Sequence, residues 1–259
     1  MTQPVRLIHF LLKVSFITAA ALATMLVIST VTATQAQTFT VLHTFTGGQD
    51  GGQPYAGLTM DKAGNLYGTT AFGGGCGLQP GCGTVFKLTR KGSGWVYTPL
   101  YTFQGGTDGA YPLARVVFGS DGTLYGTTFT GGISGCYNNL GCGTVFNLRP
   151  PSRACTTALC PWTETVLYRF TGGSDGGSPG MADLIFDQAG SLYGTTIGDN
   201  GVVYKLAPSN GGWTESVLYT FTRGNDGWDP GGGVIFDPEG NLYGVAQQGG
   251  PWEMVRFTS

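Results

Sequence analysis

Four aspartates recur in glycine-rich segments such as residues 47–51, one in each of four repeats: Asp50, Asp108, Asp175 and Asp226. Carboxylates at equivalent positions could form a ring that binds Ca²⁺ or a cationic ligand, because Ca²⁺ prefers carboxylate and carbonyl oxygens. The alternative is that each aspartate closes its own turn by accepting hydrogen bonds from backbone N–H groups. A residue repeated once per unit usually builds that unit, which favours the structural role and a chain without a required cofactor.

Three aromatic residues follow these segments: Tyr55, Tyr111 and Trp228. An aromatic ring beside a carboxylate could stack on a sugar or hold a peptide, so these residues complete a candidate ligand-binding set. The competing interpretation, which we favour, is that the three rings cover the core between neighbouring repeats.

Other charged residues suggest a channel pair or a catalytic pair. Arg115 and Asp183 stand at the same position of neighbouring repeats and could form an ion pair in a central channel, a role that is more often architectural than catalytic. Asp183 and Asp229 lack equivalents in the other repeats and are candidate acids for a polysaccharide hydrolase or lyase. After the leader the chain has one histidine, His43, and no Ser–His–Asp set can be assigned.

The six cysteines fall into three closely spaced pairs: Cys76 with Cys82, Cys136 with Cys142, and Cys155 with Cys160. Six cysteines allow 15 pairings, so the sequence alone does not fix the connectivity. In an exported chain the close spacing favours local disulfides within each pair. Zinc is the weaker alternative, because the pairs lack the short Cys-x2-Cys spacing and have no histidine nearby.

The elements that would position these residues are given by an internal repeat. Its most regular part is Leu-Tyr-Gly-Thr-Thr after an Asp-containing turn, with the tyrosines at 67, 125, 193 and 243. Each copy predicts four short strands joined by glycine turns, over residues of about 54–104, 111–171, 179–222 and 230–258. No segment after the leader has a sustained period of 3.6, so almost no helix is expected.

The fourth copy lacks a fourth strand, and residues 39–45 resemble that strand. Pairing of residues 39–45 with the last sheet, bringing Val41 close to Val255, would close a ring without an incomplete sheet. The sequence therefore predicts an all-β, four-bladed β-propeller over residues 37–259. The alternative architecture is a larger ring built from two chains.

The combined pattern of Leu-x-Thr-Phe, Gly-Gly-x-Asp-Gly, the Leu-Tyr-Gly-Thr-Thr strand and Gly-Thr-Val-Phe-Lys-Leu resembles the GloVer tandem repeat of bacterial "choice-of-anchor" surface proteins. The resemblance covers residues 39–258. It implies an exported repeat protein and no particular activity.

Composition agrees with a folded and exported chain. Of 259 residues 46 are Gly and only 11% are charged, but 41% are hydrophobic, which argues against disorder. The net charge of −2 offers no electrostatic surface for nucleic acid. Arg6 and Lys13 precede an apolar stretch and small residues up to Ala36, which predicts a signal peptide over residues 1–36, with an uncleaved membrane anchor as the alternative.

These observations favour a secreted, periplasmic or cell-surface protein, with no membrane span after the signal peptide. We expect a monomeric binding or scaffold module whose loop face takes a glycan or a protein surface. The alternative is an enzyme, a propeller-type polysaccharide hydrolase or lyase, and a third possibility is a purely structural repeat.

Overall fold

The structure is a computed structural model, and it describes residues 38–151, 162–250 and 255–257. The chain divides into two compact units, Met1–Val41 and Leu42–Ser259. The described residues of the first unit, 38–41, form no strand. All the elements below belong to the second unit.

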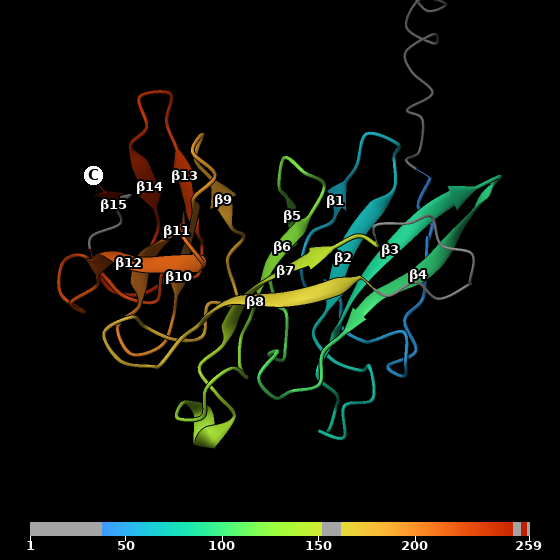
Figure 1. The fold of residues 1–259 in the computed structure, drawn as a ribbon, viewed down its shortest axis with the longest axis horizontal. Helices are drawn as coiled ribbons and strands as arrows, with labels where there is room; N and C mark the ends of the chain where they lie inside the picture. Colours follow the sequence, from blue (N-terminus) through green and yellow to red (C-terminus); the bar gives the residue numbers. More distant parts are fainter. Residues whose placement is uncertain (1–37, 152–161, 251–254, 258–259) are drawn as a thin grey trace, which may run out of the picture. The chain divides into compact units, whose positions relative to one another are not determined.

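Four antiparallel sheets follow one another along the second unit (Figure 1). The first contains β1 (Thr59–Met60), β2 (Leu66–Thr70), β3 (Thr84–Lys91) and β4 (Gly94–Thr102). The second contains β5 (Val117–Phe118), β6 (Leu124–Thr128), β7 (Thr144–Arg149) and β8 (Thr163–Arg169). The third contains β9 (Ile185–Phe186), β10 (Leu192–Thr196), β11 (Val202–Ser209) and β12 (Gly212–Thr220). The last contains β13 (Val234–Phe236), β14 (Leu242–Gly244) and β15 (Val255–Phe257).

Every strand pairs with the next strand in the sequence within its own sheet, so each sheet is a simple meander. Within the described part of the chain the only helix is the short 3₁₀ turn η1 (Tyr137–Asn139). Small meandering sheets that pack on one another in sequence order are the building plan of β-propellers. The all-β, propeller-like prediction is therefore confirmed.

Each sheet packs on its neighbour through an apolar core, which defines three junctions. Phe103 contacts Phe146 across the first junction, with ring centroids 5.1 Å apart, and Phe170 contacts Tyr204 across the second at the same distance. Edge-to-face ring pairs of this kind contribute about 0.5–1.5 kcal/mol beyond the apolar area they bury.

The glycine of the repeated Leu-Tyr-Gly-Thr-Thr strand has a packing reason. A Cβ atom there would lie 2.5 or 2.6 Å from an aromatic side chain of the following strand, as at Gly68 with Phe86, Gly126 with Phe146, and Gly194 with Tyr204. Only a residue without a side chain allows this ring to lie against the strand.

Among the described residues no strand pairing closes the ring. Residues 38–46 form no strand, and the last sheet has three strands among the described residues. His43 stacks on Tyr97 at 4.7 Å, and Phe45 contacts Phe86 at 5.0 Å, so both rings pack on the first sheet. Phe45 thus packs on β3 as Phe103 packs on β7. Within the second unit, residues 42–45 and β15 stand at opposite ends of the row of sheets (Figure 1).

Candidate functional site

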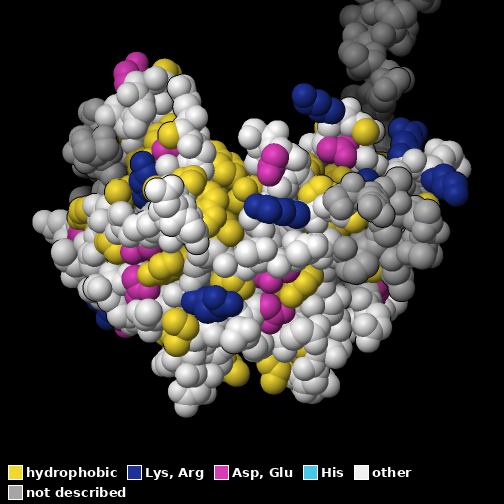
Figure 2. Space-filling model, viewed as in Figure 1, with side chains coloured by type: hydrophobic (Ala, Val, Ile, Leu, Met, Phe, Trp, Pro, Cys, Tyr) yellow, Lys and Arg dark blue, Asp and Glu magenta, His cyan; other side chains and the backbone are white. Residues whose placement is uncertain are grey.

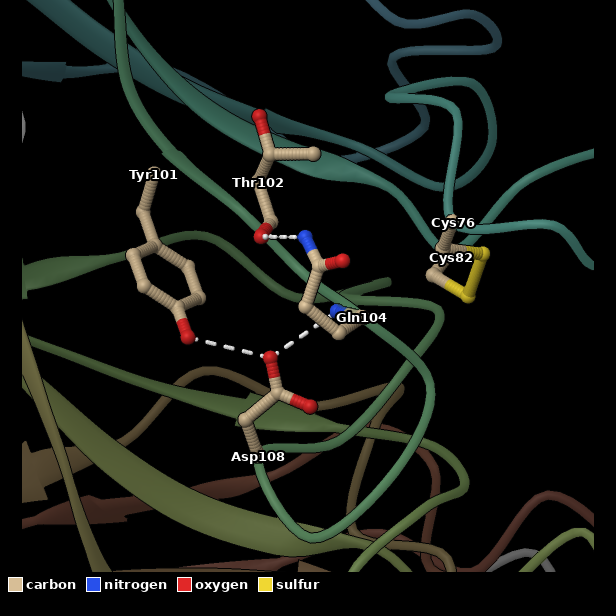
Figure 3. Close-up of a disulfide and its surroundings, with 6 residues drawn as sticks. All are labelled: Cys76, Cys82, Tyr101, Thr102, Gln104 and Asp108. Carbon is tan, nitrogen blue, oxygen red and sulfur yellow. Dashed lines mark hydrogen bonds between the residues drawn. A yellow bond between two sulfur atoms is a disulfide. The ribbon is translucent and has the colours of Figure 1, made fainter.

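The repeated aspartates lie each in a separate turn. Asp108 accepts hydrogen bonds from the Gln104 backbone N–H at 2.9 Å and from the Tyr101 hydroxyl at 3.0 Å (Figure 3). Asp175 and Asp226 accept the same two hydrogen bonds from the equivalent residues of their own repeats. Asp50 accepts a hydrogen bond from the Thr46 backbone N–H at 3.1 Å, and His43 Nε2 lies 3.3 Å from its Oδ2. These bonds correspond to the structural role weighed from the sequence.

No three Asp, Glu, His or Cys side chains gather closely enough to hold a metal ion in the described part of the chain. The four aspartates are therefore not brought together as a metal-binding ring. Hydrogen bonds from the Thr222 hydroxyl and backbone hold the pKa of Asp226 below its ordinary value, so this carboxylate stays charged within its turn.

The three candidate aromatic residues have different surroundings. Tyr111 is half-buried against Phe72, with ring centroids 5.4 Å apart, and Trp228 lies beneath the guanidinium of Arg223 at 4.9 Å. Tyr55 is exposed, and its hydroxyl donates a hydrogen bond to Gln53. Tyr111 and Trp228 thus serve packing, and Tyr55 alone presents its ring to solvent.

The ion pair expected between Arg115 and Asp183 is present. Arg115 Nη2 lies 2.8 Å from Asp183 Oδ2, and the Arg115 backbone N–H donates to Asp183 Oδ1 at 2.9 Å. Asp229 accepts a hydrogen bond from Gln248 at 3.3 Å. Of the two candidate acids for hydrolysis, Asp183 is therefore paired with Arg115, and Asp229 is hydrogen-bonded to the Gln248 amide. The ion pair of Arg115 and Asp183 connects the segment before β5 with the segment before β9.

Two of the three predicted disulfides are confirmed, Cys76–Cys82 and Cys136–Cys142, and the pair Cys155 and Cys160 lies outside the described residues. A Cβ atom on Gly105 would lie 2.5 Å from Cys82 Sγ, so the first disulfide packs directly on the loop that carries Asp108 (Figure 3). The disulfides indicate an oxidising, extracellular compartment.

Two half-buried glutamates at the junctions are not among the predicted site residues. Glu164 and Glu215 occupy matching positions in β8 and β12, and each has a buried carboxyl oxygen without a hydrogen-bond partner. Burial, and then the nearby charge of Asp108, raises the pKa of Glu164 to about 7. Burial and Asp175 raise the pKa of Glu215 in the same way. The matching positions of the two glutamates are visible in the sequence, but the nearby aspartates are not.

This arrangement predicts a pH-dependent stability. Because the pKa of Glu164 is raised in the folded state, its contribution to stability is complete below about pH 4.5 and is lost as the pH rises through about 7. We expect the melting temperature to fall by a few degrees between pH 5 and pH 8, and the fall to be smaller in Glu164→Gln. Circular dichroism melts would measure both, with Glu239→Gln in an exposed turn as the control. Equal pH profiles for wild type and Glu164→Gln would contradict the assignment.

A groove of about 1010 Å³ lies between the third and last sheets. Its floor contains Tyr193, which packs on Phe236 with ring centroids 5.0 Å apart. Lys205 Nζ lies 5.2 Å from the centre of the Tyr193 ring and 3.5 Å from Asp187 Oδ2. Leu218 lines the groove and is 41% exposed. The groove thus combines an aromatic floor, an aliphatic wall and charges of both signs.

Hydrophobic side chains also gather on the face drawn in Figure 2, in the hollow between the β13–β14 hairpin and the β5–β6 hairpin. No helix in the described ranges is long and apolar enough to cross a membrane.

A family model for the Gloeobacter/Verrucomicrobia repeat matches residues 27–165, more than half of the chain. The chain belongs to this repeat family. The match confirms the resemblance to the GloVer repeat, and the third and last sheets extend the same pattern beyond the matched residues. No curated protein matches the sequence.

Several solved structures are similar in part. One is a proposed gluconolactonase, with 20% identity and a TM-score of 0.42 over 73% of this chain and 56% of that chain. Another is a proposed 6-phosphogluconolactonase from Bacteroides uniformis, with 16% identity and a TM-score of 0.40 over 80% of this chain and 57% of that chain. A third is a xylan β-1,4-xylosidase from Bacillus halodurans, with 12% identity and a TM-score of 0.43 over 83% of this chain and 42% of that chain. The chain spans about half the length of these proteins, and likenesses this distant assign no activity to it.

Proposed function

We propose that the chain is an exported scaffold module that binds a protein segment in the groove between its third and last sheets. The observation that carries this proposal is the groove itself, in which the aromatic floor at Tyr193 adjoins the exposed Leu218. Binding sites typically combine an apolar lining with a few polar groups that orient the ligand, here Lys205, Asp187 and Glu239.

A protein segment is favoured over a glycan because the groove adjoins an open sheet. Among the described residues β15 pairs with β14 on one side only. An extended peptide can add a strand at such an edge, with backbone hydrogen bonds giving affinity and side-chain pockets giving specificity. In this proposal residues 1–36 are the signal peptide and residues 37–259 the exported module. The loop aspartates shape their turns and do not bind the ligand.

The test uses a peptide with the sequence of β12, residues 213–221, as the probe. We expect saturable binding that weakens about tenfold or more in Leu218→Asp, because a charge would be buried against the peptide. Val96→Asp is the matched control, since Val96 is 45% exposed on β4, outside the groove. Fluorescence anisotropy would measure the affinity.

A panel of soluble polysaccharides, incubated with the protein and analysed for products, separates binding from catalysis. We expect no products. Turnover on this panel would favour a hydrolase or lyase, and absence of peptide binding by the wild type would overturn the proposed function.

A further inference from the structure

The three junctions share one aromatic pair each, formed by the tyrosine of the repeated strand and a phenylalanine of the next sheet. The ring centroids are 5.0 Å apart for Tyr67 and Phe118, 5.1 Å for Tyr125 and Phe186, and 5.0 Å for Tyr193 and Phe236. The floor of the groove is therefore the third copy of a repeated feature, and the other two copies show what lies on it.

In the first two junctions a tryptophan lies on the tyrosine. Trp162, just before β8, lies 6.2 Å from Tyr67, and Trp213 in β12 lies 6.2 Å from Tyr125. The Trp162 backbone N–H also donates to the Leu100 carbonyl at 3.0 Å. The covering group is thus the start of the fourth strand of the following sheet.

The third junction has no such cover within the described residues. Leu218 occupies in β12 the position of Leu100 in β4, and it is 41% exposed whereas Leu100 is 3% exposed. The neighbouring Val217 is 37% exposed. The physical difference is that the last sheet contributes three strands here, while the second and third sheets contribute four.

The chain carries a segment of matching sequence at its other end. Residues 40–45, Thr-Val-Leu-His-Thr-Phe, align with residues 216–221 of the third repeat, Ser-Val-Leu-Tyr-Thr-Phe. In this alignment Phe39 stands at the position of Glu215 and Val41 at the position of Val217. Phe39 is 88% exposed and Val41 is 60% exposed.

Within the second unit, residues 42–45 do not pair with β15 of the same chain. His43 and Phe45 pack on the first sheet, at the opposite end of the row from β15. We propose that residues 39–45 of a second copy form the fourth strand of the last sheet, beside β15 and over the groove, so that copies associate head to tail. This inference rests on the proposed function and names a second copy of the chain as the partner. It replaces the expectation from the sequence that the protein is a monomer. Such a contact is heterologous, and it forms rings where the rotation between copies closes.

Sedimentation velocity of the exported protein over a wide concentration range tests the proposal. We expect self-association that weakens about tenfold or more in Val41→Asp and in Leu218→Asp, because each places a charge in the apolar contact. Val96→Asp is the control and associates like the wild type.

The decisive sample is an equimolar mixture of Val41→Asp and Leu218→Asp. Val41→Asp keeps an intact groove and Leu218→Asp keeps an intact segment, so the mixture forms one heterodimer although each variant alone is monomeric. A wild type that stays monomeric but still binds the peptide of residues 213–221 would overturn this inference alone. A wild type that neither associates nor binds that peptide would overturn the proposed function as well.

Discussion

Replacement of Gly143 by alanine is expected to lower the free energy of unfolding by about 2–5 kcal/mol. Gly143 has a φ of +89°, where an L side chain costs about 1–2 kcal/mol. Its Cβ would also lie 2.5 Å from Pro179 Cδ and 2.5 Å from the Thr128 carbonyl oxygen. Relief of this overlap requires a backbone shift, which adds about 1–3 kcal/mol as in other overpacked sites.

The shift would also disturb two backbone hydrogen bonds of this glycine, to Gly131 at 3.0 Å and from Phe170 at 3.1 Å. Prolines of the following loop contact glycines in the same way at the other junctions, Pro112 at Gly83 and Pro230 at Gly201. The contact is therefore part of the packing that joins each sheet to the next.

Gly122→Ala is the matched control for the backbone. Gly122 has a φ of +80°, and no atom lies within 4 Å of the point that a Cβ atom would occupy, so only the conformational cost of about 1–2 kcal/mol applies. Urea unfolding followed by tryptophan fluorescence would measure both variants. Equal losses in the two would show that the Pro179 contact does not matter.

Phe146→Ala is expected to cost about 3–5 kcal/mol, the usual range for a buried aromatic residue. Phe146 is fully buried in the core of the first junction, where it contacts Phe103 of the first sheet and lies over Gly126 of its own sheet. Its removal leaves a cavity that the rigid neighbouring strands cannot fill.

Because each sheet packs on its neighbours in sequence, the loss should also uncouple the first sheet from the others. We expect a second unfolding transition in Phe146→Ala and a single transition in Phe146→Leu, which keeps most of the volume. Differential scanning calorimetry would resolve them. A loss below about 1 kcal/mol would mean that the first junction is not held by this core.

The local features could be predicted from the residue types and their spacing. The repeat around Tyr67, Tyr125, Tyr193 and Tyr243 predicted the meandering strands, and the close spacing of the cysteines predicted the disulfides Cys76–Cys82 and Cys136–Cys142. The turn role of Asp108 was also readable, because its partners Gln104 and Tyr101 lie within seven residues. Such features depend on groups that are neighbours along the chain, and their types and spacing are written in the sequence.

The other features depend on how the sheets pack on one another. Residues 39–45 match a fourth strand in sequence, but among the described residues β15 pairs only with β14, while His43 and Phe45 pack on the first sheet. The raised pKa of Glu164 depends on burial and on the nearby charge of Asp108. The groove depends on which of two equivalent leucines, Leu100 or Leu218, is covered. Equivalent repeats carry nearly equal local patterns, so only the packing of one sheet on another distinguishes their partners, their exposure and their charge.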